Sequence, residues 1–239
     1  MNPLHIVVLD RDTLVNRPFE FDFPHTLSSY GTTEAHETLE RIRGADIVIT
    51  NKVVISAQAF AENPQLKLVA VTATGVNNVD VEAAKQNGTA VCNIRAYGNE
   101  SVAEHAFMMM ITLMCNLPAY QRDVAAGLWE NSPFFCHLGA PMRDLNGKTL
   151  AIFGRGNIGK TLATYAQAFK MNVVFAEHKN AQSVRDGYVS FEEAIRSADV
   201  VSLNCPLTPQ TANMIGEAEL QQMKPGAILI NCGRGGLVD

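Results

Sequence analysis

Charged residues and paired cysteines are both scarce in this sequence. Only 18% of the 239 residues are charged, the formal net charge is −5, and no basic tract occurs. A mildly acidic chain of this kind binds nucleic acid or an anionic membrane surface poorly, so we expect neither as a partner. The five cysteines are scattered, without CxxC or Cys/His spacing, which disfavours a zinc site and a disulfide framework. We therefore expect no metal site, and reduced thiols in a cytoplasmic protein.

The sequence also lacks a long hydrophobic run. Its most apolar segment, residues 106–117, is too short to cross a bilayer, and the N-terminal residues do not combine a basic stretch with a long apolar one. We therefore expect neither a membrane span nor a signal peptide. Hydrophobic residues nevertheless make up 47% of the chain, which is enough for a sizeable core in one large domain or two modest ones.

Short apolar runs rich in β-branched residues alternate with helical patterns along the chain. The runs predict strands at residues 5–10, 45–50, 66–75, 89–94, 148–154, 171–177, 199–205 and 226–232. Residues 32–44 are predicted as a helix, and a long, almost wholly apolar helix begins at Ser101. Strands that alternate with helices indicate βαβ units and parallel sheets. We therefore predict an α/β fold with two doubly wound parallel-sheet lobes, divided near Asn99.

Three glycines stand at GxGxxG spacing in the stretch AIFGRGNIGKTLA: Gly154, Gly156 and Gly159. A predicted strand runs into the first glycine, and apolar residues at helical spacing follow the last. In a dinucleotide fingerprint, such glycines permit a tight turn, a close approach of the backbone to a pyrophosphate, and close packing of helix on strand. The N–H groups at the helix N-terminus favour the phosphates. A tight turn in an α/β domain without a ligand is the alternative.

Glu177 ends the next predicted strand, 18 residues after Gly159. A carboxylate there can accept hydrogen bonds from the adenosine ribose and repels a 2′-phosphate, which favours NAD over NADP. His178 and Lys179 follow at once, however, and a cation at this point could tolerate the phosphate. We expect NAD as the cofactor, with NADP less favoured.

Further candidate residues follow strands, where open α/β sheets bind their ligands. Cys205 and Pro206 come straight after one strand, which suits a loop beneath an adenine or a ribose. Arg234 lies between glycines after the last strand, where it either grips a carboxylate in two places or remains a solvated surface arginine.

The first half of the chain offers a second group of candidates. Thr74 and Gly75 follow a strand and can turn backbone N–H groups toward an anion, although an ordinary turn before the next helix is the alternative. Tyr97 precedes the long apolar helix, and its phenol either faces a cleft or packs.

Five stretches, in this order, resemble the D-isomer-specific 2-hydroxyacid dehydrogenase family: TGVNNVD, AYGNESVAEHAF, LNGKTLAIFGRGNIG, CPLTPQT and NCGRGGLVD. The resemblance covers the whole chain and is strongest to bacterial members that interconvert D-glycerate and hydroxypyruvate. It implies an NAD-dependent oxidoreductase, in a homodimer, that acts on a small D-2-hydroxy acid and its 2-oxo acid. It also implies a flavodoxin-like substrate domain at residues 1–98 and a Rossmann NAD-binding domain at residues 99–239.

The resemblance assigns roles to individual residues. Arg234 matches the catalytic arginine, which binds the substrate carboxylate and polarises the C2 oxygen. The implied substrate site adds the backbone of Thr74 and Gly75, and Tyr97. The implied cofactor site comprises Gly154, Gly156, Asn157, Ile158, Gly159, Glu177, Cys205, Pro206, Thr211, Cys232, Gly233 and Arg234.

The chain departs from the family at its end. The family's acid–base histidine and the glutamate that supports it lie beyond the arginine, whereas this sequence stops at Asp239. We therefore expect a C-terminally truncated piece of a longer enzyme, with an incomplete cofactor domain, weak cofactor binding and little turnover. A non-catalytic, dinucleotide-sensing co-regulator of the same fold is the alternative function.

Overall fold

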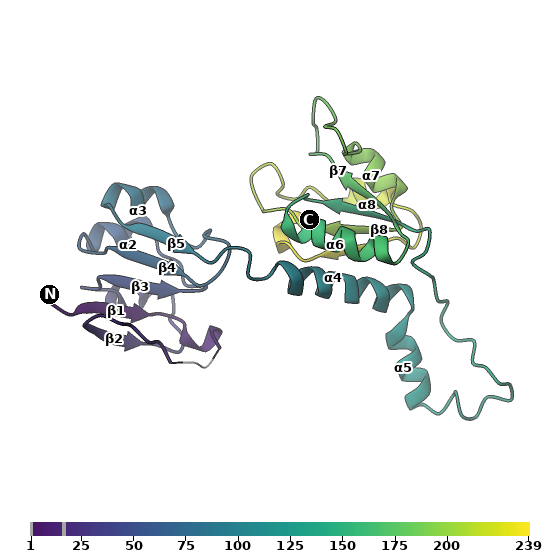
Figure 1. Ribbon diagram of the computed structural model, residues 1–239, viewed down its shortest axis with the longest axis horizontal. Coiled ribbons are helices and arrows are strands. Elements are labelled where there is room, and N and C mark those ends of the chain that lie inside the picture. Colours follow the sequence, from purple (N-terminus) through teal and green to yellow (C-terminus); the bar gives the residue numbers. More distant parts are fainter. Residues whose placement is uncertain (1, 16–17) are drawn as a thin grey trace. The chain divides into compact units, whose positions relative to one another are not determined.

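The computed structural model describes residues 2–15 and 18–239 (Figure 1). The chain divides into two compact units, residues 1–97 and 98–239, and each contains its own parallel β-sheet. The predicted α/β class with two parallel-sheet lobes is therefore confirmed.

The first unit has a five-stranded parallel sheet with the strand order β2-β1-β3-β4-β5. The strands are β1 (Leu4–Val8), β2 (His25–Ser29), β3 (Ile47–Thr50), β4 (Leu68–Val71) and β5 (Ala90–Asn93). The helices are α1 (Thr38–Arg41), α2 (Ala57–Glu62) and α3 (Val81–Asn87). This strand order is the flavodoxin-like order of doubly wound sheets.

Both faces of this sheet are covered, which explains why its inner strands, β1, β3 and β4, are mainly apolar without strict alternation. Val7 belongs to a buried cluster with Ile42 and Phe60, on one face of the sheet. Ile6 and Val8, on either side of Val7 in the strand, belong to a separate cluster, against which the side chains of Phe19, Phe21 and Phe23 pack. Successive side chains of a strand point to opposite faces, so β1 contributes to both layers.

Three elements of the first unit differ from the sequence prediction, and one of them, the short helix α2, was not predicted. The strand β2 was not predicted, because its sequence HTLSS is polar; it lies at the edge of the sheet and is only partly buried. The helix predicted over residues 32–44 is helical only over Thr38–Arg41. The Thr33 hydroxyl donates a hydrogen bond to the Leu9 carbonyl at 2.5 Å, which holds the start of the segment to the end of β1 instead of in a helical turn.

The second unit has a four-stranded parallel sheet with the order β7-β6-β8-β9. The strands are β6 (Thr149–Phe153), β7 (Asn172–Ala176), β8 (Val200–Leu203) and β9 (Ile228–Asn231). The helices are α4 (Asn99–Met114), α5 (Leu117–Ala125), α6 (Asn157–Ala168), α7 (Phe191–Ser197) and α8 (Glu217–Gln222).

This sheet also lies between two helical layers. Leu150 and Ile152 of β6 belong to a buried cluster with side chains of α4 and α6, whereas Ala151 and Phe153 belong to another with side chains of α7. The apolar helix α4 is therefore part of the core, and Figure 1 shows it alongside α6.

A further strand beyond β7 is reduced to one parallel bridge, between Ala176 and Val189. The Glu177 N–H donates to the Val189 carbonyl at 2.9 Å, and the Val189 N–H donates to the Phe175 carbonyl at 2.9 Å. With this bridge counted, the second sheet has the order 3-2-1-4-5, which is that of the first five strands of a Rossmann fold.

Among the described residues, no single helix is long and apolar enough to cross a membrane; the pair α4 and α5, bent by 60° at the break between them, passes that test by length and composition together.

Candidate functional site

The glycine-rich stretch joins β6 to α6, as its spacing predicted. Gly154 has a φ of 110°, and a Cβ atom there would lie 2.8 Å from the carbonyl carbon and oxygen of Asn204. A Cβ atom on Gly159 would lie 2.1 Å from the Gly154 carbonyl oxygen. At Gly156, in contrast, a Cβ atom would meet no described atom within 4 Å. Two of the glycines are therefore required by the chain's own packing, and the third leaves its backbone open to a ligand.

This turn lies at a topological switch point. The chain goes from β6 through α6 to β7 on one side, while β8 pairs with the other side of β6. Ligands of open α/β sheets bind in the crevice that such a switch creates at the carboxyl ends of the strands. No side chain among the described residues caps the N-terminus of α6, so its first N–H groups remain available to an anion.

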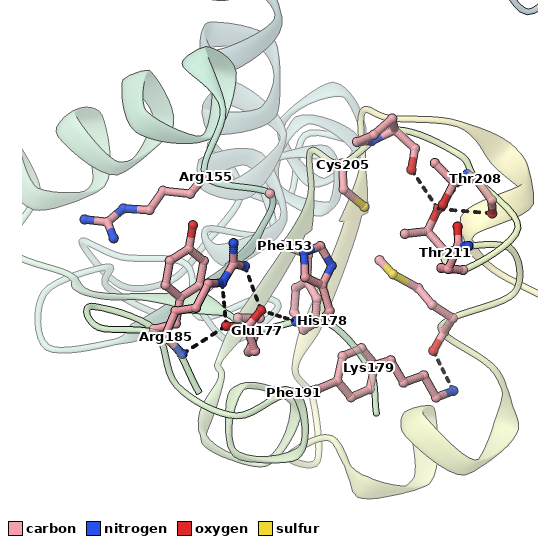
Figure 2. A pocket seen from close by; sticks show the side chains of 16 residues that line it. Phe153, Arg155, Glu177, His178, Lys179, Arg185, Phe191, Cys205, Thr208 and Thr211 are labelled. Atoms are coloured by element: carbon pink, nitrogen blue, oxygen red, sulfur yellow. Dashed lines mark hydrogen bonds and ion pairs between the residues drawn. The ribbon is translucent and has the colours of Figure 1, made fainter. Parts of the chain in front are cut away.

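A pocket of about 490 Å³ opens beside the turn, at the carboxyl ends of β6, β7 and β8 (Figure 2). Of the cofactor residues expected from the sequence, Gly154, Glu177, Cys205, Pro206 and Thr211 line it. The others lie outside its lining: Gly156, Asn157, Ile158, Gly159, Cys232, Gly233 and Arg234. The structure thus brings five of the expected residues together at one pocket and leaves the other seven outside its lining.

The carboxylate of Glu177 is the central polar group of this pocket, and Glu177 as a whole is only 3% exposed. Its Oε1 atom accepts from the His178 N–H at 2.8 Å and from Arg185 Nη2 at 2.6 Å. Its Oε2 atom accepts from the Arg185 N–H at 3.1 Å and from Arg185 Nε at 2.7 Å. Figure 2 shows the guanidinium group of Arg185 lying directly over the carboxylate. The pair is therefore bidentate, the strongest geometry for these groups.

These bonds lower the pKa of Glu177 to about 2, the side-chain bond from Arg185 contributing most. A carboxylate whose pKa is depressed in the folded state stabilises the fold above its unfolded pKa, and this contribution is lost as the pH falls toward the folded value.

The variant Glu177→Gln should therefore be less stable than the unaltered protein at pH 7, and the difference should shrink as the pH falls from about 4.5 to about 2. Urea denaturation midpoints at pH 7, 4 and 3 measure it. Glu130→Gln, at an exposed site in the same unit, is the control and should show little difference at any pH. A deficit of equal size at every pH would contradict the assigned role of the ion pair.

Two arginines and a tyrosine form one wall of the pocket. The Arg185 Cζ atom lies 4.2 Å from the centroid of the Tyr188 ring, and the Arg155 Cζ atom lies 5.3 Å from the same centroid. Arg155 also lies over the Phe175 ring, at 4.9 Å. Cation–π contacts of this kind hold both guanidinium groups against the rings at the pocket, while both arginines remain exposed to solvent.

In the sequence, Lys179 is a cation close to Glu177 that could tolerate the 2′-phosphate of NADP. In the structure, its ammonium group pairs with residues other than Glu177. Its Nζ atom lies 2.8 Å from Glu219 Oε1 and donates to the Met214 carbonyl at 3.0 Å. Its charge is thus paired at the far wall, whereas Arg185 is the cation that touches Glu177.

The loop after β8 forms the opposite wall and is closed by Thr211. The Thr211 hydroxyl donates to the Pro206 carbonyl at 2.7 Å and accepts from the Thr208 N–H at 2.8 Å. Burial raises the pKa of the Cys205 thiol, which therefore stays protonated and acts as a small apolar group. The loop thus contributes Cys205, Pro206 and Met214 as apolar surface beside the polar side chains of Thr208, Gln210 and Thr211.

Arg234 follows β9, the last strand of the sheet. The Asn231 side chain closes this turn: its Nδ2 atom donates to the Arg234 carbonyl at 2.8 Å, and its Oδ1 atom accepts from the Gly233 N–H at 3.0 Å. The Arg234 side chain is exposed, and its Nη1 atom donates to the Gly233 carbonyl at 3.0 Å. Its guanidinium group is thus accessible at the carboxyl edge of the sheet.

The substrate candidates of the first unit lie at the carboxyl edge of its own sheet. Thr74 and Gly75 follow β4, and Asn93 Nδ2 fixes their turn by donating to the Thr74 carbonyl at 2.6 Å. Tyr97, at the end of the unit, is 66% exposed. Buried Asp10 orders the neighbouring loop after β3 by accepting the N–H groups of residues 51–53, a role that the sequence reasoning missed.

Arg155, Arg185 and Tyr188 were also missed in the sequence. Arg155 stands inside the glycine motif, where its position alone could have suggested it. Arg185 and Tyr188 lie in an irregular segment without a recognisable pattern, and only the folded chain brings them to Glu177. Among the described residues, no group of three or more His, Cys, Asp or Glu side chains could hold a metal ion.

A glycine-rich turn at the switch point of a Rossmann sheet, with an acid at the end of the next strand, defines a dinucleotide-binding α/β protein. The sequence model described as "D-isomer specific 2-hydroxyacid dehydrogenase, NAD binding domain" matches residues 107–239. A glycerate dehydrogenase from Methylorubrum extorquens is 42% identical over 235 residues, which are 98% of this chain and 74% of that protein. A hydroxypyruvate reductase from Blautia hydrogenotrophica is 35% identical, over 86% of this chain and 65% of that protein.

The fold is similar to solved structures as well. The crystal structure of the TT0316 protein from Thermus thermophilus superposes with a TM-score of 0.82, at 30% identity, over 99% of this chain and 76% of that one. The chain therefore belongs to the D-isomer-specific 2-hydroxyacid dehydrogenase family, as its sequence motifs indicated. It is an NAD-dependent enzyme of the D-2-hydroxyacid dehydrogenase class, and nothing in these similarities supports the alternative of a non-catalytic regulator.

Proposed function

We propose that this enzyme interconverts hydroxypyruvate and D-glycerate, with NADH and NAD as the coenzyme pair. The observation that carries the choice of substrate is the 42% identity, over 98% of this chain, to a protein named glycerate dehydrogenase. The similarity to a hydroxypyruvate reductase supports the same pair of compounds. The exposed guanidinium group of Arg234 supports a carboxylated substrate.

Residues 98–239 are proposed as the coenzyme domain and residues 1–97 as the substrate domain. The pyrophosphate is proposed to rest on the N-terminus of α6, against Gly154, Gly156, Asn157, Ile158 and Gly159. The adenosine is proposed to occupy the pocket at Glu177, Cys205, Pro206 and Thr211. Cys232 and Gly233 are proposed to lie near the nicotinamide.

The bound nicotinamide supplies or accepts the hydride at C2 of the substrate. Arg234 is proposed to bind the substrate carboxylate through two N–H groups and to stabilise the negative charge that grows on the C2 oxygen during reduction. Of the first unit, Thr74 and Gly75, through their backbone N–H groups, and Tyr97 are proposed as substrate-binding residues. These groups fix the orientation of C2, on which the rate of hydride transfer depends.

A cytoplasmic homodimer is proposed as the working form. Large apolar side chains are exposed along α4, α5 and the segment that follows them, among them Met108, Val124, Trp129 and Phe135. An apolar surface of this extent supports an interface with a second subunit.

The whole protein that contains this chain should reduce hydroxypyruvate with a kcat/KM at least about tenfold higher than that for pyruvate, because a site built to bind the C3 hydroxyl is left unsatisfied by an analogue without it. Loss of NADH absorbance with hydroxypyruvate, glyoxylate and pyruvate measures the ratios. A preference for pyruvate would contradict the proposed substrate but not the enzyme class.

A further inference from the structure

The carboxylate of Glu177 has no acceptor position left for a ribose. An ionised carboxylate offers about four acceptor positions. The N–H groups of His178 and Arg185 and the Nε and Nη2 atoms of Arg185 together occupy four. The usual argument that an acid at this point selects NAD requires free carboxylate oxygens and an unbalanced negative charge. Neither condition holds while Arg185 is in place.

The charge of the pocket points the same way. Glu177 is the one carboxylate among the described residues that line it, whereas Arg155, Lys179 and Arg185 contribute three cations. Lys179 is balanced by Glu219 outside the lining and Arg185 by Glu177, so Arg155 leaves a local excess of one positive charge. A dianionic phosphate group would be attracted to this wall instead of repelled by it.

Arg185 is also placed to meet a ligand. Its side chain is 53% exposed, and only Nε and Nη2 of its guanidinium group bind the Glu177 side chain. Its stacking on the Tyr188 ring, at 4.2 Å, holds the planar group in one orientation. An arginine held in this way can bind a phosphate in two places without releasing the carboxylate behind it.

We propose that Arg185 is a coenzyme-specificity residue, which neutralises Glu177 and binds the 2′-phosphate of NADP(H), so that the enzyme accepts NADPH as well as NADH. The proposal rests on the proposed placement of the adenosine in this pocket. With Arg185 present, the pocket can also accept NADPH, which Glu177 alone would repel.

The test compares Kd values for NADH and NADPH, measured by fluorescence titration of the whole protein. The unaltered protein should bind the two within about tenfold of each other. Arg185→Ala should weaken NADPH binding about 10- to 100-fold, the value of one or two charge-assisted hydrogen bonds, while NADH binding stays equal or tightens because Glu177 is released. Arg196→Ala, which removes an arginine of α7 that bonds Gln222 outside the pocket, should leave the ratio unchanged.

A second pair of probes separates this proposal from the proposed function. Adenosine 2′,5′-bisphosphate and 5′-AMP differ only in the 2′-phosphate, and neither can react. If NADH and 5′-AMP bind but NADPH is rejected more than about 100-fold and Arg185→Ala leaves that ratio unaltered, the role of Arg185 is wrong and the coenzyme site stands. If neither 5′-AMP nor NADH binds, the placement of the adenosine itself is wrong.

A second variant controls for the possibility that Arg185→Ala lowers NADPH affinity by destabilising the fold. Arg185→Ala leaves a buried carboxylate without its partner, so the double variant Glu177→Gln, Arg185→Ala is measured beside it, with thermal unfolding as the check on structure. The double variant should show the same loss of NADPH affinity. If it bound NADPH as tightly as the unaltered protein does, the 2′-phosphate would not be held by Arg185.

Discussion

Replacing Arg234 by lysine should lower kcat/KM for hydroxypyruvate about 100- to 1,000-fold, the usual effect of removing one donor that stabilises a developing oxyanion. Lysine keeps the charge but replaces a planar fork with a point charge, so two parallel hydrogen bonds to a carboxylate are no longer possible. The turn around Arg234 is closed by Asn231 and by the backbone and does not depend on the guanidinium group. The fold should therefore survive the change.

Two measurements separate a role in the reaction from a role in coenzyme binding. The Kd for NADH should stay within about threefold of the original value, because Arg234 lies outside the lining of the pocket proposed for the adenosine. Arg196→Lys, at an exposed arginine of α7, is the matched control and should leave kcat/KM unaltered. An Arg234→Lys enzyme that retains full kcat/KM would exclude this arginine from the chemistry.

Gly159→Ala should abolish coenzyme binding and destabilise the second unit by about 3 kcal/mol or more, at the upper end of what overpacking costs. The added methyl group would lie 2.1 Å from the Gly154 carbonyl oxygen and 3.1 Å from the Ile152 side chain. The first of these neighbours is backbone and cannot rotate away. Relief requires α6 to move off β6, and that movement displaces the N–H groups proposed to hold the pyrophosphate.

Gly156→Ala provides the contrast within the same motif. A Cβ atom there meets no described atom within 4 Å, so the melting temperature should change little, whereas NADH should bind at least about tenfold more weakly if the pyrophosphate approaches this backbone. Fluorescence titration and thermal unfolding of both variants give the comparison. Equal NADH affinity in Gly156→Ala and the unaltered protein would place the pyrophosphate elsewhere.

The sequence predicted most of the strands because both sheets are covered on both faces. A covered strand is mainly apolar, and runs such as those of β1 and β6 stand out from their surroundings. The edge strand β2 was missed for the opposite reason, since partial burial leaves it polar. The helix α1 was predicted too long because its pattern did not reveal the hydrogen bond from Thr33 to Leu9.

Some residues of the candidate site could likewise be predicted from the sequence, and others could not. The glycines and Glu177 could be found because their roles are local: a positive φ, a close helix and the end of a strand impose residue types at fixed spacing. Arg185 could not be found in this way. Arg185 reaches Glu177 from eight residues away along an irregular segment. From the sequence alone, Lys179 or His178, which lie closer to Glu177 in the chain, could equally have been the cation that pairs with it.

The segment that ends at the Ala176–Val189 bridge and the glycine turn differ in how well they tolerate substitution. Residues 178–188, which include Arg185, form a loop after β7. The backbone rejoins β7 at that bridge, through two backbone hydrogen bonds. Insertions or substitutions in this excursion disturb few sheet contacts, as is usual for surface loops. The glycine turn, held between β6, α6 and the backbone of Asn204, has no such freedom. Substitutions in residues 178–188 can thus change the proposed coenzyme preference, whereas the glycine turn proposed to hold the pyrophosphate tolerates little change.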